Sequence, residues 1–402
     1  MEEAKVKDNN YQNVQEYVVG MRRKLHQIPE RGVYLPKTQA MVCAELDKMG
    51  IPYKKNNVEF EGQVDSGIVA LIEGKNKDKV IALRADMDAL PILEETNAEY
   101  KSLHEGSMHA CGHDIHTSML LGAAKLLNDR KAELNGSVKL FFQTSEEIVT
   151  GAKMLIQGGA MENPKVTAVF GMHVWPLPTM APGQVCIGEG TMMASGDRFQ
   201  IHVKGKGCHG YSPERGIDPI VIAAEIITAI QKIISRETPV DEAMVISLCQ
   251  VHGGTAWNII PDVVTIEGTA RTMSKEMRDF VVKRIEEIST GVAKTMRAEC
   301  QVEWISGTPA VVNDAELTNI IINAAENAFG PNNVTCFEKP TMGNEDVSWF
   351  FEYAPGAFAF LNITNKEKGL DHPLHSSKFE VDEDVLWKGS ALYTQTALDY
   401  LK

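Results

Sequence analysis

Short apolar runs that end next to carboxylates or histidines recur through the first 175 residues of the chain. Four such runs, each predicting a buried strand, span residues 67–72, 80–86, 137–143 and 168–173. Patterns that predict helices occupy residues 13–27, 38–49 and 114–127. This alternation is typical of an α/β domain with a mostly parallel sheet, whose ligand sites lie at the carboxyl ends of the strands.

The pattern changes near residue 195. Strands are predicted at residues 197–205, 243–252, 263–272 and 299–306, with helices at 218–235 and 275–298. The order β-α-β-β-α-β is the split, ferredoxin-like arrangement. Beyond residue 308, a helix (317–329), a strand (357–362) and a closing helix (384–401) return to the α/β pattern. We therefore predict a larger α/β domain in two parts, 1–194 and 308–402, interrupted by a smaller inserted α+β domain at 195–307.

Composition narrows the class of protein. The chain has 402 residues, of which 44% are hydrophobic, and this is enough for more than one domain core. A net charge of -14 argues against binding to nucleic acid or to an anionic membrane surface. The first ten residues lack the apolar core of a signal peptide, and the seven cysteines are scattered. We expect a cytoplasmic protein without disulfides.

The segment His109-Ala-Cys-Gly-His-Asp-Ile-His116 is dense in side chains that can bind a metal ion. Gly112 separates Cys111 from His113 and allows a tight turn, so that both side chains can converge. Thiolate and imidazole together suit zinc or another first-row divalent ion. The alternative is a helix N-terminus rich in hydrogen-bonding side chains, with Asp114 as the N-cap.

Three more candidates lie farther along the chain. Glu146 and Glu147 follow a predicted buried strand, a position where a solvated surface is less natural, and one carboxylate could bind metal while the other faces substrate. His173 ends the next apolar run, and His375 lies in a predicted loop. Taken alone, His173 is more typical of a core residue, and His375 could equally be a surface residue.

At this point the motifs resemble a known family. Residues 109–124, His-Ala-Cys-Gly-His-Asp-Ile-His-Thr-Ser-Met-Leu-Leu-Gly-Ala-Ala, are similar to the signature of the metal-dependent N-acyl-amino-acid amidohydrolases. This branch of the aminoacylase and carboxypeptidase metallopeptidases includes hippurate hydrolases, auxin-conjugate hydrolases and N-acetyldiaminopimelate deacetylases. Further motifs follow in order at 83–91, 142–147, 171–176, 253–262, 268–272, 342–346 and 372–376.

The resemblance implies hydrolysis of N-acyl amino acids by two divalent ions per subunit, Mn²⁺ or Zn²⁺, with Co²⁺ or Ni²⁺ also compatible. It implies five metal ligands: Cys111, His113, Glu147, His173 and His375. It makes the two-part domain catalytic and residues 195–307 a lid and dimerisation domain. It also makes Glu146 the general base and His209 a catalytic residue that reaches a neighbouring subunit of a homodimer formed through the lid. Asn258 and Arg271 resemble contacts to the substrate carboxylate. We expect Asp86 to orient a ligand histidine.

The chain departs from the family pattern at three positions. Thr144 stands where relatives commonly have proline, Asn344 where they have serine, and Glu214 where the lid motif usually has a second histidine. The departure at Glu214 puts the borrowing of a relative's substrate in doubt. An aminoacyl-dipeptide or aminobenzoyl-glutamate peptidase therefore stays an alternative within the family.

Two hypotheses lie outside this mechanism. Cys111 could be a nucleophile with a histidine partner. The chain could also be a binding or scaffold protein with a degenerate metal site. The intact Glu146-Glu147 pair argues against a scaffold, because a protein that only binds metal does not need an additional base.

Overall fold

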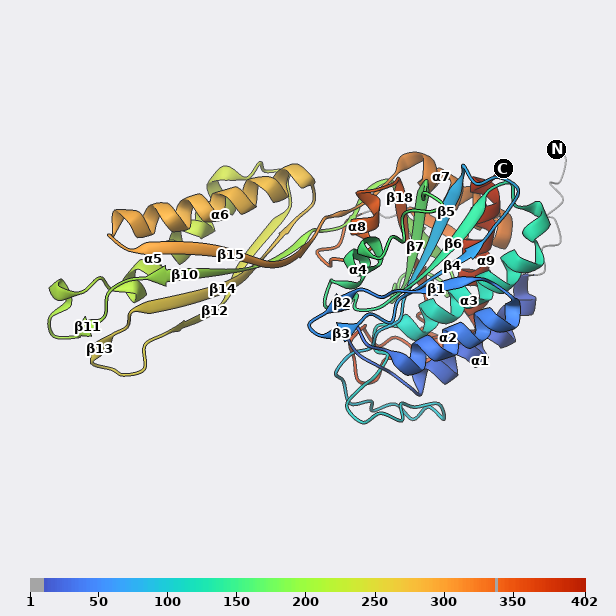
Figure 1. The fold of residues 1–402 in the computed structure, drawn as a ribbon, viewed down its shortest axis with the longest axis horizontal. Helices are drawn as coiled ribbons and strands as arrows, with labels where there is room; N and C mark the ends of the chain where they lie inside the picture. Colours follow the sequence, from blue (N-terminus) through green and yellow to red (C-terminus); the bar gives the residue numbers. More distant parts are fainter. Residues whose placement is uncertain (1–10, 337–338) are drawn as a thin grey trace. The chain divides into compact units, whose positions relative to one another are not determined.

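The computed structural model describes residues 11–336 and 339–402, which form two compact units (Figure 1). The larger unit comprises the described parts of 1–192, 312–339 and 346–402. The smaller unit comprises 193–311 and 340–345. Within the described residues, no helix is both long and apolar enough to span a membrane.

An eight-stranded sheet forms the centre of the larger unit. Its strands lie in the order β1 (Tyr53–Lys55), β4 (Ile68–Ile72), β6 (Ser137–Gln143), β5 (Val80–Asp86), β7 (Ala168–Trp175), β18 (Gly356–Asn362), β8 (Val185–Ile187) and β17 (Val334–Cys336). The four central strands β6, β5, β7 and β18 run parallel, whereas β4 and β8 pair antiparallel with β6 and β18. The carboxyl ends of the four parallel strands therefore meet at one edge.

Helices cover both faces of this sheet. They are α1 (Gln15–His26), α2 (Pro36–Met49), α3 (His113–Asp129), α4 (Gly151–Gln157), α7 (Ala315–Phe329), α8 (Ser348–Phe351) and α9 (Leu386–Tyr400). Helices α3 and α9 contact β5, while α4 contacts β6 and α8 contacts β18 (Figure 1). Every residue of β5, β6 and β18 is buried, because strands covered on both faces need apolar side chains on both.

The smaller unit is a four-stranded antiparallel sheet with two helices. The strand order is β12 (Met244–Gly253), β14 (Val263–Thr272), β10 (Gly196–Lys204) and β15 (Glu299–Thr308). Helices α5 (Pro219–Lys232) and α6 (Lys275–Thr295) pack on it around a separate apolar core (Figure 1). Residues of β14 alternate between buried and more exposed, as expected for a sheet covered on one face. The predicted fold class, a mostly parallel α/β sheet with an inserted α+β unit, is confirmed.

Some local predictions were incomplete. The described chain also contains short strands: β2 (Glu59–Phe60), β3 (Gln63–Val64), β9 (Gly190–Met193), β11 (Cys208–His209), β13 (Ile259–Ile260) and β16 (Val311–Asn313). The seven-residue helix α4 was also not predicted. The predicted helix 218–235 changes at Ile233 into a π-helical turn, Ile233–Glu237. These elements are too short to show a clear hydrophobic period.

Candidate metal centre

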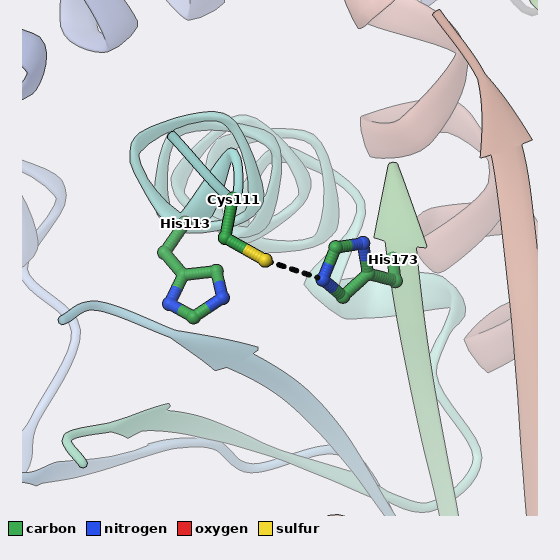
Figure 2. Close-up of side chains that lie close together, drawn as sticks. All are labelled: Cys111, His113 and His173. Atoms are coloured by element: carbon green, nitrogen blue, oxygen red, sulfur yellow. Dashed lines mark hydrogen bonds between the residues drawn. The ribbon is translucent and has the colours of Figure 1, made fainter. Parts of the chain in front are cut away.

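The turn that enters α3 presents Cys111 and His113 side by side (Figure 2). Gly112 between them has a φ of 85°, and a Cβ built on it would lie 2.5 Å from Cγ2 of Val174. Only glycine suits both this left-handed conformation and this close approach. The Cys111 side chain is therefore held near that of His113, and both residues are buried.

His173 enters the same cluster from the carboxyl end of β7 (Figure 2). Its Nδ1–H donates to the carbonyl oxygen of Val174 at 2.5 Å. That bond leaves Nε2 with its lone pair, which faces Sγ of Cys111 at 3.4 Å. Ligand atoms of Cys111, His113 and His173 all lie within 4.8 Å of one another. Such an arrangement could hold one cation.

Glu146, Glu147 and His375 bring further ligand atoms to the cluster. Glu147 Oε1 lies 3.9 Å from His113 Nε2 and 3.6 Å from His375 Nε2. The other carboxylate, Glu146 Oε2, lies 4.0 Å from His113 Nε2. His375 Nε2 is 3.3 Å from Sγ of Cys111. The triad Cys111, Glu147 and His375 therefore shares its thiol with the triad of Cys111, His113 and His173.

The chemistry of these donors fits metal ions. Both ring nitrogens of His113 and Oε1 of Glu147 are buried without a hydrogen-bond partner among the described residues. Buried polar atoms in proteins are almost always satisfied, so Nε2 of His113 and Oε1 of Glu147, unsatisfied and 3.9 Å apart, indicate an ion. One thiol, three imidazoles and a carboxylate form a mixed donor set that suits divalent first-row transition-metal ions.

The pKa shifts of two candidate ligands agree with a site for metal ions. Burial raises the pKa of Glu147 to about 7, and His113 opposes the shift while Asp88 reinforces it. Burial also holds the pKa of the Cys111 thiol well above its usual value. Burial thus disfavours the charged forms of both groups, and a bound cation would favour their ionised, ligating forms.

Asp88 is a part of the centre for which the sequence analysis assigned no role. Its carboxylate accepts the backbone N–H groups of Glu146 at 3.0 Å and Glu147 at 3.2 Å. Oδ1 also lies 3.4 Å from Nδ1 of His113. Asp88 therefore orients the two glutamates and lies against the histidine. Its place two residues after Asp86, at the end of the same strand, was the available signal.

Asp86 contacts a histidine other than the predicted ligands. Its Oδ1 lies 2.5 Å from Nδ1 of His116, whose Nε2 accepts the N–H of Val174 at 2.8 Å. Because Nε2 must be the acceptor, Nδ1 carries the proton, and both nitrogens of His116 are occupied. His116 thus supports the strand that carries His173. The predicted ligand His113 lies 3.8 Å from Asp86 through Nε2.

Arg84 ties this region to the sheet. It is fully buried, and its Nη1 and Nη2 donate to Asp86 at 2.7 Å and Asp346 at 2.9 Å. Its Nε donates to Gln143 at 2.9 Å. Gln143 also donates to Asp346 at 2.7 Å, which completes a buried hydrogen-bond network around Arg84.

Asp114 does not cap α3. The N-cap is Gly112, and the Asp114 carboxylate instead pairs with Arg22 Nε at 2.9 Å and His26 Nδ1 at 2.8 Å. The carboxylate is thereby committed to α1, and Asp114 links the two helices. His109 is also buried, and both of its ring nitrogens lack partners among the described residues.

A cavity of about 790 Å³ in the larger unit is lined by Asp88 and Glu147 together with Tyr34, Leu90 and Ile148. Its volume is in the range of small-molecule sites, and its wall combines apolar side chains with a carboxylate of the centre. The cavity is therefore large enough for a small molecule next to Glu147.

The remaining predicted residues lie in the smaller unit. His209 is an exposed residue of β11, and Gly210 N–H donates to the carbonyl oxygen of Asn258 at 2.8 Å. Arg271 is a half-buried residue of β14 whose Nη1 donates to Asn344.

Most of the chain is similar to known proteins. Residues 82–399 match the profile described as Peptidase family M20/M25/M40. IAA-amino acid hydrolase ILR1-like 4 of Arabidopsis thaliana is 40% identical over 390 residues, covering 96% of this chain and 86% of the relative. N-acetyl-L-cysteine deacetylase of Bacillus subtilis is 36% identical over 392 residues, covering 96% and 89%.

A solved structure adds the metal content of one relative. It is the Bacillus subtilis YXEP protein, described as a dinuclear metal binding peptidase from the M20 family. It is 34% identical, covers 98% of this chain and 99% of its own, and superposes with a TM-score of 0.78. The resemblance inferred from the motifs is confirmed. The chain belongs to the M20 peptidase family of metal-dependent enzymes, in the amidohydrolase branch that includes IAA-amino acid hydrolases and N-acetylcysteine deacetylase.

Proposed function

We propose that the protein hydrolyses the amide bond of N-acyl amino acids and releases a carboxylic acid and a free amino acid. The convergence of five candidate ligands beside a carboxylate carries this proposal: Cys111, His113, Glu147, His173 and His375, with Glu146 adjacent. The ligands would hold two divalent ions, Mn²⁺ or Zn²⁺, with Co²⁺ or Ni²⁺ also compatible. The printed functions of relatives, on IAA-amino acids and N-acetyl-L-cysteine, support this substrate class.

Glu146 would move the proton in this reaction. When bound, the cations would supply Lewis acidity, which would lower the pKa of a water molecule and polarise the amide carbonyl. Glu146 takes one proton from the attacking water as the water oxygen bonds to the carbonyl carbon. It then gives that proton to the leaving nitrogen as the C–N bond breaks. His209, supplied by a neighbouring subunit, would donate a hydrogen bond to the oxyanion.

The two other hypotheses are less well supported. A cysteine nucleophile needs a thiolate in an electropositive, accessible place. Cys111 is buried, and burial raises the pKa of its thiol. A scaffold protein does not account for Glu146, whose backbone is held by Asp88 next to the candidate ligands.

A substrate panel tests the proposal. Metal-reconstituted protein should hydrolyse at least one of a set of N-acetyl, N-benzoyl and N-indoleacetyl amino acids, measured by release of the free amine. Dipeptides and aminobenzoyl-glutamate form a second arm of the panel. Faster cleavage in that arm would replace the aminoacylase assignment by the peptidase alternative, and no cleavage in either arm would remove the proposed function.

We also propose that the protein is a homodimer formed through residues 195–307. Strand β12 is an edge of its sheet with exposed Val245 and Val251, and Trp257 is 97% exposed. An exposed apolar edge strand is a surface that a second chain can cover. Sedimentation equilibrium should give twice the mass of the chain, and a monomer at micromolar concentration would contradict the proposal.

A further inference from the structure

A buried lysine lies in the middle of strand β6, on the face of the sheet that is opposite the main apolar core. Its neighbours Val138 and Leu140 belong to that core, so the alternation of side chains along the strand places Lys139 on the other face. Only 3% of Lys139 is exposed. Lysine is almost never buried to this extent unless its ammonium group is paired.

Two backbone carbonyl groups contact this ammonium group. Nζ of Lys139 donates to the carbonyl oxygens of Ala160 at 2.7 Å and Glu162 at 2.6 Å. Within the described residues it has no other hydrogen-bond partner and no carboxylate within 4 Å. Because an ammonium group has three N–H donors, one donor is left without a partner there. Burial lowers the pKa of Lys139 to about 8, as expected for a buried cation that lacks a counterion.

Lys139 lines a cavity of about 660 Å³ in the larger unit, a volume in the range of small-molecule sites. The pairing of the strands determines one side of this cavity. Leu71 of β4 is the partner of Lys139, and Val69, two residues earlier on the same face, is the partner of Lys54 in β1. The lining also includes Leu155 of α4. Apolar side chains therefore lie next to a buried cation.

The charged side chains around the cavity favour an anion. They are three lysines and two glutamates: Lys54, Lys55, Lys139, Glu73 and Glu162. Glu73 pairs with Lys77 at 3.1 Å, whereas Lys54 and Lys55 form no ion pair with any described residue. Since the buried charge is positive and much of the wall is apolar, a fitting ligand combines one negative group with an apolar body.

We propose that this cavity binds a monocarboxylate with an apolar body, whose carboxylate pairs with Lys139 and whose body lies against Leu71 and Leu155. The carboxylate accepts the remaining N–H of Lys139 and supplies the missing counterion. The site is separate from the candidate metal centre, because none of the residues that line it lines the cavity beside Glu147.

Isothermal titration calorimetry of the metal-loaded protein with octanoate and octanamide tests this proposal. The two probes share an apolar body, and only octanoate carries a charge. A hydrogen bond to a charged group is worth roughly 10- to 150-fold in affinity, so the parent protein should bind octanoate at least about tenfold more tightly than octanamide. Equal binding of the two probes, or no binding of octanoate at millimolar concentration, would overturn the proposal.

Lys139→Met separates this site from any other that binds carboxylates. Methionine keeps an apolar chain in the strand and removes the charge. The variant should bind octanoate at least about tenfold more weakly than the parent protein and bind octanamide equally well. Lys125→Met removes an exposed lysine of α3 and should bind both probes as the parent protein does. Octanoate binding at the parent affinity in Lys139→Met would place the ligand elsewhere and overturn the proposal.

A second pair of variants keeps Lys139 and its bonds to the two carbonyl groups, and it decides the question if Lys139→Met does not fold. Leu71→Glu places a carboxylate opposite Lys139 in the neighbouring strand, whereas Leu71→Gln places an uncharged side chain of the same shape there. The built-in carboxylate should compete for Lys139, so Leu71→Glu should bind octanoate at least about tenfold more weakly than Leu71→Gln. Equal octanoate affinities in these two variants would contradict the pairing with Lys139.

Discussion

Replacing Glu146 by glutamine is expected to lower kcat on N-acyl amino acids by about 10²- to 10⁴-fold while bound metal is retained. This range is the usual contribution of a general base. Glutamine has nearly the shape of glutamate but cannot accept the proton of the attacking water. The backbone bond from residue 146 to Asp88 does not involve the side chain and should persist. Steady-state kinetics and metal analysis of the same preparation measure both quantities.

Glu189→Gln provides a control of the same chemistry. Glu189 is exposed in the larger unit, and its replacement removes one negative charge without touching the centre. Its kcat should equal that of the parent protein. A Glu146→Gln protein that keeps its metal and hydrolyses at the parent rate would remove Glu146 from the mechanism.

Replacing Arg84 by methionine is expected to lower the free energy of unfolding by about 3–5 kcal/mol, the cost of breaking a buried ion pair from one side. Methionine fills most of the volume, so the loss arises mainly from charge. Asp86 and Asp346 would stay buried with no cation between them. Urea unfolding of both proteins in the same chelator measures the difference.

Arg31→Met removes an arginine that is exposed on the larger unit, and it should change the free energy of unfolding by no more than about 0.5 kcal/mol. If Arg84→Met unfolds at the same urea concentration and with the same slope as the parent protein, the buried network does not stabilise the fold.

Long segments with a regular hydrophobic pattern made most of the fold predictable from the sequence. Residues 137–143 and 263–272 were predicted as strands with the observed bounds of β6 and β14. The first contains an apolar run interrupted only by Lys139, and the second alternates over its whole length. Helix α4 and strand β17 were not predictable in this way. Strand β17 has three residues, and it is defined by pairing with β8, which lies about 150 residues earlier in the chain.

The candidate site, like the fold, could be predicted from the sequence only in part. The five ligand candidates were found by motif, and the structure places them in two groups of three that share Cys111, although their role as ligands stays a prediction. The supporting contacts were harder to anticipate. Asp114 was considered as an N-cap, but the N-cap is Gly112, and the Asp114 carboxylate pairs with Arg22 and His26 from a helix about 90 residues earlier. The residues next to Asp114 in the sequence do not reveal partners that lie so far away along the chain. The contacts of Asp88 with the backbone of Glu146 and Glu147 could not be predicted for the same reason.

Metal titration with simultaneous rate measurement tests the central claim most directly. Metal-free protein is titrated with Mn²⁺ or Zn²⁺, and bound metal and hydrolysis of an N-acetyl amino acid are followed in the same samples. We predict no turnover without metal and full turnover when two ions are bound per chain. Full turnover in the metal-free protein, or occupancy of both sites with no turnover on any N-acyl amino acid, would contradict the account.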